Sequence, residues 1–555
     1  MTGLNIRPVA VTILVTMAGL LLTLGCHKES DVDGGVDDDV DRDTDVDVDS
    51  DADTDGDRDG DTDADRDGDT DGDRDGDTDG DRDGDTDRDA YSSRAIEITI
   101  DGAQTYQTMH GIGASTNNYM RDMEPALYDP VMHSLYINEL RASVARIGID
   151  GDIIYNDNNP VALEEIDYQK APWDFEALWM KWHMGELSKD QSRSKRSIHW
   201  AKHLVEKDPT MKIIGSSWSP PSWMKENKQT VHGSKLLEKY IPHYARFLAQ
   251  WVKGLKEVYN IDVYAISLQN EPLFTQSYAS CTYPSDGILY RKVFVATVDE
   301  LKNNGLTARL FGPEDMTRFP ERVMGYVEPI LSDPEYSEYL TAIAAHGYTD
   351  GVTSDNNEGA NKLWSLIKPH NKEYWMTETG YGENETFGTE NSGITYELGG
   401  KLFNMIAIGN ASLITMWTFH GSEPSQHSCI TMINSEWPAP GEYVKGLRFY
   451  VFKHFARNIR PGMVRVDADP MIRDDFQVMA FHHKENGRLT IILNKHENSE
   501  TALKVSLKNL PPISTLRKYI TDGSASYRSD PDIEVVNNEF TITMSRSLVS
   551  LVHGE

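Results

Sequence analysis

Short apolar runs alternate with helical patterns through the middle of the 555-residue chain. Eight of these runs are too short for helices and are bounded by turn-forming residues, so each is predicted to be a buried β-strand. The predicted strands are His110–Gly113, Ser143–Ile149, Lys212–Trp218, Val263–Gln269, Ala308–Gly312, Thr341–His346, Glu373–Thr377 and Ser412–Trp417. Before the fourth, apolar side chains recur at helical spacing from Tyr240 to Leu255, which predicts an amphipathic helix. This alternation predicts an α/β fold, a (β/α)8 TIM barrel with insertions.

A different pattern begins at about Arg460, where short β-like runs follow one another without a helical stripe between them. Asn486-Gly487, between the first two runs, is a typical hairpin turn. The pattern predicts an appended antiparallel β-sandwich domain over residues 459–555, after a catalytic barrel over residues 93–458. A further alternating run, Ala95–Ile100, precedes the barrel and can join the β-domain. The runs in the β-domain are Phe476–Phe481, Leu489–Asn494, Ala502–Leu507, Glu539–Met544 and Leu548–Val552.

Aspartate dominates residues 31–90, where every odd-numbered position from Asp41 to Asp89 is Asp. The segment holds 30 Asp and 6 Arg and therefore carries −24 of the total formal charge of −35. Its intervening positions follow an eight-residue cycle of Thr, Arg and Gly without a recurring apolar side chain. Residues 27–92 are therefore predicted to be a disordered, self-repelling acidic linker. The rest of the chain is also acidic, which argues against nucleic-acid binding, because that requires a basic face.

The acidic linker also contains DxDxDG sequences, which begin an EF-hand loop. An EF-hand needs a bidentate glutamate at loop position 12 as well. Counting twelve residues from any Asp between Asp41 and Asp89 never reaches a glutamate. We therefore expect no folded EF-hand, whereas weak Ca²⁺ association with the linker is compatible with its charge.

The N-terminal residues have the pattern of an export signal. Arg7 precedes an uncharged run, Val9–Leu24, that is short for a membrane span and suits a secretory signal. The run ends at Leu22–Cys26, which resembles a bacterial lipoprotein lipobox except at Thr23. Residues 1–26 are therefore interpreted as a signal peptide with lipidation at Cys26, and plain secretion is the alternative. The protein is expected to be exported, as a cell-surface or outer-membrane lipoprotein or in secreted form.

Two further cysteines, Cys281 and Cys429, each follow a predicted barrel strand. Cysteines of an exported protein can pair. The sequence does not show whether their Cα atoms approach within about 7 Å, so the pairing stays open. Zinc-type spacing of cysteine and histidine is absent from the sequence.

Two of the predicted barrel strands lead into a glutamate. LQNEP at Leu268–Pro272 contains Glu271, and WMTETG at Trp375–Gly380 contains Glu378. The C-terminal ends of parallel barrel strands meet at one face, so two glutamates far apart in the sequence can lie together there. Cleavage of a glycosidic bond with retention requires two carboxyl groups about 5 Å apart, one protonated and one ionised.

Five motifs in this order resemble glycoside hydrolase family 30, the glucosylceramidase-like group of clan A retaining glycosidases. They are WSPPSWMK (Trp218–Lys225), SLQNEP (Ser267–Pro272), AAHGY (Ala344–Tyr348), WMTETG and RNIRPG (Arg457–Gly462). The resemblance extends from about Ala95 to the C-terminus. It implies a retaining β-glycoside hydrolase without a metal or organic cofactor, with Glu271 as acid/base and Glu378 as nucleophile. It also implies substrate-binding roles for Arg146, Trp218, Asn270, His346, Tyr348 and Trp417.

These roles make physical demands on the site. Glu271 needs a raised pKa to keep its proton. Glu378 needs hydrogen-bond donors to stay ionised, and Arg146 and Tyr348 are the candidates. Asp150 and Asp152, after the second strand, can contact sugar hydroxyls or cap a helix, and neither reading is favoured.

The substrate is expected to be a β-linked polysaccharide or glycoconjugate. Two loops, at Gly111–Met120 and Glu378–Gly380, depart from the family pattern and leave the linkage open. An endo-β-glycanase, such as a xylanase or β-1,6-glucanase, is the alternative among enzymes. The alternative from another class is a non-catalytic surface carbohydrate-binding or adhesion protein with a Ca²⁺-responsive stalk, and the presence of both glutamates argues against it.

Overall fold

The structure is a computed structural model that describes residues 95–115, 130–151, 193–348, 351–380, 393–421, 429–432, 443–473, 475–523 and 526–554. The chain divides into two units, Met1–Arg88 and Asp89–Glu555. The signal peptide, Cys26 and nearly all of the acidic linker belong to the first unit. They lie outside the described residues, as does Asp152, so the predictions about them stay predictions. Among the described residues, none of the helices combines the length and apolar character of a membrane span.

Eight parallel strands close into a barrel, as the alternating pattern predicted. In chain order they are β2 (Gly111–Ser115), β3 (Val144–Asp150), β4 (Lys212–Ser219), β5 (Val263–Ser267), β6 (Arg309–Met316), β7 (Leu340–Gly347), β8 (Glu373–Thr379) and β9 (Ala411–Met416). The ring closes where β2 pairs with β9, with Ile112 opposite Ile414. Each predicted strand is present, with ends that differ by a few residues. The fold class is therefore confirmed.

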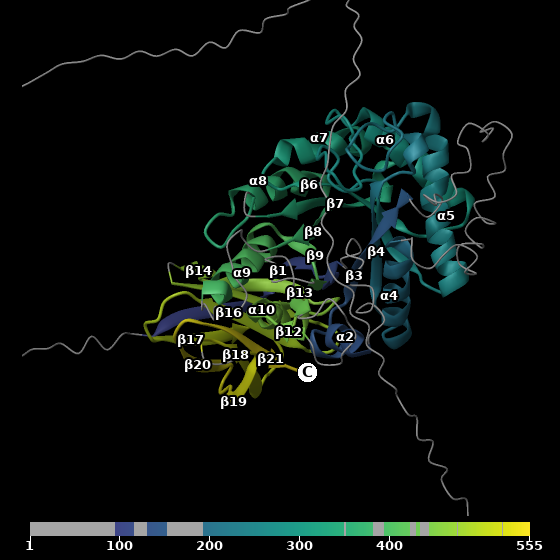
Figure 1. Cartoon of the computed structure of the whole chain (residues 1–555). Helices are drawn as coiled ribbons and strands as arrows, with labels where there is room; N and C mark the ends of the chain where they lie inside the picture. The colour runs from purple at the N-terminus through teal and green to yellow at the C-terminus, as the bar shows by residue number, and fades with distance from the viewer. Residues whose placement is uncertain are drawn as a thin grey trace, which may run out of the picture. The chain divides into compact units, whose positions relative to one another are not determined.

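Helices cover the outside of the barrel (Figure 1). They are α2 (Pro130–Ser134), α4 (Arg193–Lys207), α5 (Ile241–Tyr259), α6 (Ile288–Asn303), α7 (Pro320–Leu331), α8 (Glu358–Ile367), α9 (Gly393–Phe403) and α10 (Leu447–Ala456). The predicted helix is α5, which buries the apolar stripe and ends at Asn260 in the left-handed conformation, φ 56°. Trp251 of α5 lies so near β4 that a Cβ at Gly215 would be 2.7 Å from its ring. Glycine at that position lets the helix approach the strand.

The barrel interior has a compact apolar filling. Successive residues of a strand point to opposite sides, so Ile214 faces the interior while Ile213 packs with the surrounding helices. The interior cluster is Val144, Ile214, Ala265, Phe311, Ala342, Ala344, Trp375 and Leu413. Polar side chains are thereby confined to the two ends of the barrel, and the C-terminal end is where such folds carry their active sites.

The second sheet has ten strands and shares the C-terminal unit with the barrel. Its strands are β1 (Ile96–Thr108), β13 (Val464–Asp469), β14 (Ile472–Arg473), β15 (Phe476–His482), β16 (Leu489–Lys495), β17 (Thr501–Lys508), β18 (Thr515–Thr521), β19 (Arg528–Glu534), β20 (Glu539–Met544) and β21 (Ser547–His553). The order is β19-β18-β21-β16-β15-β13-β1-β17-β20, with β14 on β15. Every pair is antiparallel except β1 with β17.

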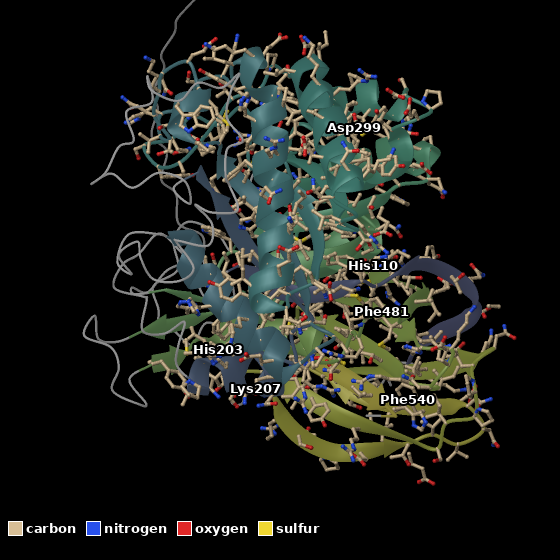
Figure 2. The ribbon with its side chains drawn as sticks, turned by 90° about the vertical axis from the view of Figure 1, so that its right-hand side faces the viewer. His110, His203, Lys207, Asp299, Phe481 and Phe540 are labelled. Atoms are coloured by element: carbon tan, nitrogen blue, oxygen red, sulfur yellow. The ribbon has the colours of Figure 1, made fainter. Side chains whose placement is uncertain are left out.

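The two faces of this sheet bury different clusters. Phe540 of β20 belongs to the core within the sheet, whereas Phe481 of β15 packs with the core around the barrel. Figure 2 shows Phe481 on the side toward the barrel and Phe540 farther from it. The sheet is continuous, and hydrogen-bonded strand pairing extends through it from β19 at one end to β20 at the other. The exact boundary between barrel and β-domain stays a prediction.

The sequence pattern missed four strands of this sheet, β13, the two-residue β14, β18 and β19. The edge strand β19 reads RSDPDIE, with charged side chains, an internal proline and mostly exposed or half-exposed residues. Charge and proline are common on edge strands, where they oppose pairing with another chain, and they remove the apolar alternation. The predicted run Ala95–Ile100 is the start of β1, which pairs with β13 and β17. A three-stranded sheet of β10 (His420–Gly421), β11 (Ile430–Met432) and β12 (Tyr443–Lys445) follows the barrel.

Candidate active site

Glu271 and Glu378 lie together at the C-terminal end of the barrel. Glu271 follows β5, the fourth barrel strand, and Glu378 lies near the end of β8, the seventh. One carboxylate oxygen from each, with a nitrogen of His346, forms a group whose atoms all lie within 4.8 Å of one another. Both glutamates are buried. Strand ends that are distant in the sequence therefore place two carboxyl groups face to face.

The surroundings of Glu271 favour its protonated form. Burial raises its pKa, a hydrogen bond from His346 opposes that rise, and the charge of Glu378 adds to it, with a net increase. Nδ1 of His346 lies 2.9 Å from Oε1 of Glu271. The backbone at Glu271 is left-handed, φ 48°, a conformation that is costly outside glycine and common at functional sites. The sequence prediction of a raised pKa at Glu271 is confirmed in direction.

The surroundings of Glu378 supply donors to its carboxylate. Nη1 of Arg146 donates to Oε2 over 2.7 Å, and the hydroxyl of Tyr348 donates to Oε1. Hydrogen bonds from a cation and a hydroxyl stabilise the ionised form of a carboxylate. Both donors are the two residues that the sequence suggested. The surroundings of Glu271 thus raise its pKa, whereas the carboxylate of Glu378 accepts hydrogen bonds from a cation and a hydroxyl.

Arg146, from β3, joins five strand ends through its guanidinium group and is fully buried. Besides Glu378, it donates to Asn270 Oδ1 over 2.6 Å and to Ser216 Oγ over 3.0 Å. It also donates to Ser115 and to Glu314, whose Oε1 lies 3.1 Å from Nη2. Through these bonds the guanidinium orients both carboxylates and Asn270. A direct contact with substrate, as the resemblance implies, stays a prediction.

Glu314 is a third carboxylate in the cluster and was not predicted. It lies on β6 with a left-handed backbone, φ 63°, and its side chain is fully buried. Burial alone would raise its pKa, but the charges of Arg146 and His346 lower it to about 2. The sequence FGPED places this glutamate just beyond the predicted strand Ala308–Gly312, in the same position as Glu271 after its strand. That position was the available signal.

His346, at the end of β7, lies among the three carboxylates. Its Nδ1 is 2.9 Å from Glu271 and 3.7 Å from Glu378, and its Nε2 is 3.8 Å from Glu314. Burial alone would lower its pKa, but the charges and hydrogen bonds of these carboxylates raise it to about 10. The imidazole is therefore a cation at neutral pH. Glu271, His346 and Glu378 are close enough to hold a metal ion, which would have to displace the proton of the imidazole.

Aromatic and apolar side chains surround the carboxylates. Trp218 and Trp417, predicted to bind substrate, lie with ring centroids 5.8 Å apart, and Trp218 covers the guanidinium of Arg146 at 4.7 Å. Next to Glu271, Leu273, Phe274 and Tyr278 are 40%, 50% and 39% exposed. Burial and then the charges of Glu271 and Glu378 raise the pKa of Tyr278, so its hydroxyl lies within their electrostatic influence. These three exposed residues, which we call the apolar lip, were not singled out from the sequence.

The loop that carries the apolar lip is tied to the loop after β4. The backbone of Ser280 donates to Thr230, and the backbone of His232 donates to Gln276. Nζ of Lys225, fully buried, donates to the carbonyls of Ser280 and Thr230. Cys281 is buried beside them, and it and Cys429 are both free thiols, so the pairing left open from the sequence does not form here. The wall beside Glu271 is therefore held in a defined position.

Comparison with known proteins gives three kinds of match. Residues 148–372 match the Glycosyl hydrolase family 30 TIM-barrel domain. A Caenorhabditis elegans protein, provisionally named glucosylceramidase 1, is 21% identical over 437 residues, 72% of this chain and 76% of the relative. The glucuronoxylanase XynC of Bacillus subtilis (strain 168) is 23% identical over 359 residues, 63% of this chain and 76% of the relative.

Among solved structures, the family 30 subfamily 8 xylanase Xyn30A from Clostridium acetobutylicum superposes with a TM-score of 0.61 at 20% identity. The match covers 83% of this chain and all of the xylanase chain. At this identity the likeness shows the fold, a barrel with an appended β-domain, whereas activity has to be argued from the site.

Proposed function

The chain is a glycosidase of glycoside hydrolase family 30, and we propose that it cleaves β-glycosidic bonds by double displacement with retention. The observation that carries the proposal is the pair of facing carboxyl groups, with oxygens within 4.8 Å. Retaining enzymes have carboxyl groups about 5–5.5 Å apart, whereas inverting enzymes leave about 6.5–9.5 Å for a water molecule. The short separation supports direct attack by one of the two glutamates.

The proposed mechanism assigns the two roles by environment. Glu378, held by Arg146 and Tyr348, attacks the anomeric carbon and forms a glycosyl ester. Glu271 donates its proton to the departing glycosidic oxygen in the same step. In the second step Glu271 takes a proton from water, whose oxygen attacks the anomeric carbon and displaces Glu378. The sugar leaves with its original β-configuration, and both glutamates return to their starting states.

The cleaved sugar is proposed to bind against Trp218, Trp417 and Asn270. The aromatic faces suit the apolar face of a pyranose, since ligand sites combine apolar walls with few polar groups. Because Oδ1 of Asn270 accepts from Arg146, its amide NH2 is the part that can donate to a sugar hydroxyl. Hydrogen bonds to the 2-hydroxyl strengthen as the transition state forms and lower the barrier.

The leaving group is proposed to bind on the apolar lip. Glu271 protonates the leaving oxygen, so residues beside Glu271 lie on the leaving-group side of the bond. Leu273, Phe274 and Tyr278 are exposed there on a loop held by Lys225. A further sugar ring or a lipid-like aglycone would cover these side chains. This favours a β-linked polysaccharide or glycoconjugate as substrate, and leaves an endo-β-glycanase, such as a xylanase or β-1,6-glucanase, as the second candidate.

The test uses aryl β-glycosides of several sugars, with activated and unactivated leaving groups. Glu378→Gln should abolish turnover of all of them. Glu271→Gln should keep the first step on activated substrates, and added azide should then yield a β-glycosyl azide, because loss of the base exposes the intermediate to an external nucleophile. NMR of the first product should show the β-anomer. Release of the α-anomer, or near-normal activity of Glu378→Gln, would refute the assignment.

The natural substrate requires a separate assay. Product sizes from xylan, β-1,6-glucan and other β-glycans, and hydrolysis of glucosylceramide, distinguish the two candidates. A ladder of oligosaccharides indicates endo action, and release of single sugars or of free ceramide indicates action at a terminal sugar. Turnover of none of these substrates, together with inactivity on all aryl β-glycosides, would refute the proposed activity.

The cellular location is also a proposal and is supported by the sequence alone. We propose export through the signal at residues 1–26, with a lipid on Cys26 and the acidic linker as a tether for the enzyme. Full-length protein should partition with membranes, and Cys26→Ser should release it or leave the signal uncleaved. Equal partition of both forms would contradict the lipid anchor.

A further inference from the structure

Glu314 has no part in the two-carboxylate mechanism, yet it lies in the middle of the site. Its Oε1 lies 3.2 Å from Nε of Arg146 and 3.0 Å from Oγ of Ser216, which both donate to it. Nε2 of His346 lies 3.8 Å from the same oxygen. The side chain is fully buried, whereas Glu271 and Glu378 retain a small exposed area. Glu314 thus accepts a hydrogen bond from Arg146 and lies at ion-pair distance from His346, the two cations that orient the reacting glutamates.

The charges of the cluster balance only when Glu314 is counted. Arg146 and His346 supply two positive charges, and Glu378 and Glu314 supply two negative charges, with Glu271 protonated. Buried charge without a partner is expensive, so a cluster of this kind tends toward neutrality. Without the charge of Glu314, one positive charge would remain in excess. The cluster would regain balance most directly by losing the proton shared between Glu271 and His346.

The backbone links Glu314 to Glu271 as well. The amide of Glu271 donates to the carbonyl of Glu314 over 3.2 Å, and both residues have left-handed φ angles. Such conformations persist only where the surroundings hold them. Glu314 therefore helps to fix the position of the Glu271 side chain in two ways, through the hydrogen bond between their main chains and through His346.

We infer that Glu314 is a positioning residue for hydrolysis, whose ionised carboxylate holds Arg146 and His346 so that Glu271 keeps its proton. The inference rests on the proposed function. Glu314 does not touch the reacting atoms in this account. It acts through His346, which contacts Glu271, and through Arg146, which contacts Glu378.

The phenols near the Glu271–His346 pair remain uncharged over the relevant pH range. Burial raises the pKa of Tyr348, Tyr278 and Tyr290, and neighbouring carboxylates raise it further. These phenols stay protonated when Glu271 and His346 titrate. Among the described residues, the titratable groups that influence the pair are Arg146, Tyr278, Glu314, Tyr348 and Glu378, and Tyr290 lies near Glu314. A change in pH dependence after substitution of Glu314 can then be traced to the Glu271–His346 pair.

The experiment compares pH profiles of kcat/KM for the full chain and Glu314→Gln, on aryl β-glycosides with poor and good leaving groups. The alkaline limb of the pH profile of Glu314→Gln should lie about one unit or more below that of the unmodified chain, because the substitution removes the carboxylate charge 3.8 Å from His346. The pair shares its protons, so the limb reports the pair and not one residue. Activity at neutral pH should fall at least tenfold more for poor leaving groups, which need the acid, than for good ones.

Two variants serve as controls. Glu314→Asp retains the charge, so its alkaline limb should lie at a higher pH than that of Glu314→Gln, nearer to that of the unmodified chain. Glu373→Gln changes a carboxylate at the opposite end of the barrel, where it pairs with His110 at 2.8 Å, and should leave the limb unchanged. Circular dichroism and thermal unfolding establish that each variant is folded.

A double substitution keeps the test decisive if Glu314→Gln folds poorly. Glu314→Gln with His346→Gln removes one negative and one positive charge, so the double variant should lose little beyond His346→Gln alone. Additive losses, or an unmoved alkaline limb with equal losses for all leaving groups, would overturn the inference. Failure of the proposed function is distinct, because the unmodified chain would then hydrolyse none of the β-glycosides.

Discussion

Replacement of Arg146 by Met should destabilise the enzyme and change how its stability depends on pH. Met has a similar length and no charge, so the variant leaves Glu314 and Glu378 buried without the guanidinium that donates to both. Removing one partner of a buried ion pair costs about 3–5 kcal/mol, because the other charge stays in the interior. Unfolding of a unit of this size has an entropy on the order of 1 kcal/mol/K, so the expected fall in Tm is about 3–5 °C at pH 7.

The pH dependence follows from the pKa of Glu314. In the unmodified protein the folded pKa is about 2, below the ordinary value of 4.5. A lowered folded pKa contributes stability above pH 4.5 that is lost as pH falls toward 2, worth about 3 kcal/mol from the linkage relation. Without Arg146, the largest cause that lowers this pKa is lost while burial still raises it, so Glu314 of the variant should take up its proton at a higher pH and lose its unpaired charge. The difference in Tm between the unmodified protein and Arg146→Met should therefore become smaller as the pH falls from 7 to 4.

The assay is thermal unfolding of the unmodified and variant proteins at half-unit pH steps, because subtraction cancels the titration of all other carboxylates. Arg291→Met is a matched control, since Arg291 pairs with Asp333 and is 39% exposed. Pairs of that kind contribute about 0–1 kcal/mol, and this control should show a small difference without the narrowing. A difference in Tm that stays constant or widens below pH 7 for Arg146→Met would refute the electrostatic account of the cluster.

Three further predictions concern packing, substrate and the linker. Tyr136→Phe removes the hydroxyl that accepts from the Ala114 amide and donates to the Val144 carbonyl over 2.6 Å. It should lower the free energy of unfolding, measured by denaturation, by about 1–3 kcal/mol. The pH profile of kcat/KM should stay unchanged. Phe274→Ser should raise KM for polymeric or lipid-linked substrates and leave KM for small activated aryl glycosides nearly constant; equal changes for both would argue against leaving-group binding on the apolar lip. Deletion of Asp31–Asp89 should change neither Tm nor kcat/KM on a small soluble substrate, because the segment has no recurring apolar side chains to pack on the enzyme. A marked loss of activity would contradict the proposal that the segment is only a tether.

The eight barrel strands could be predicted from the sequence because each is buried on both sides and reads as an apolar run. Helix α5 could be predicted because burial of one face leaves a stripe of apolar side chains in its sequence. The sheet strand β19 escaped prediction because its pattern is determined by exposure at an edge, and its charges and Pro531 carry no β-signal of their own. Burial on folding is thus recorded in the sequence, whereas position at the edge of a sheet is not.

Glu271 and Glu378 could be identified from the sequence as a pair because each ends an apolar run within a recognisable motif. Their partners depend on closure of the barrel. Arg146 donates hydrogen bonds to side chains of β2, β4, β6 and β8 and to Asn270 after β5. No spacing along the chain relates these positions, because parallel strands of a closed barrel bring distant segments to one face.

The protonation states belong entirely to the tertiary structure. Glu271, Glu314 and Glu378 are the same residue type at similar strand ends, and the motifs distinguish Glu271 and Glu378 by role but do not supply the charges and burial that set each pKa. Burial raises the pKa of Glu271, whereas Arg146 and His346 lower that of Glu314 to about 2. The sequence indicated the eight barrel strands and the two glutamates that form the reacting pair. Only the fold decided which carboxyl group keeps a proton, because a pKa depends on charges and burial brought together from separate strands.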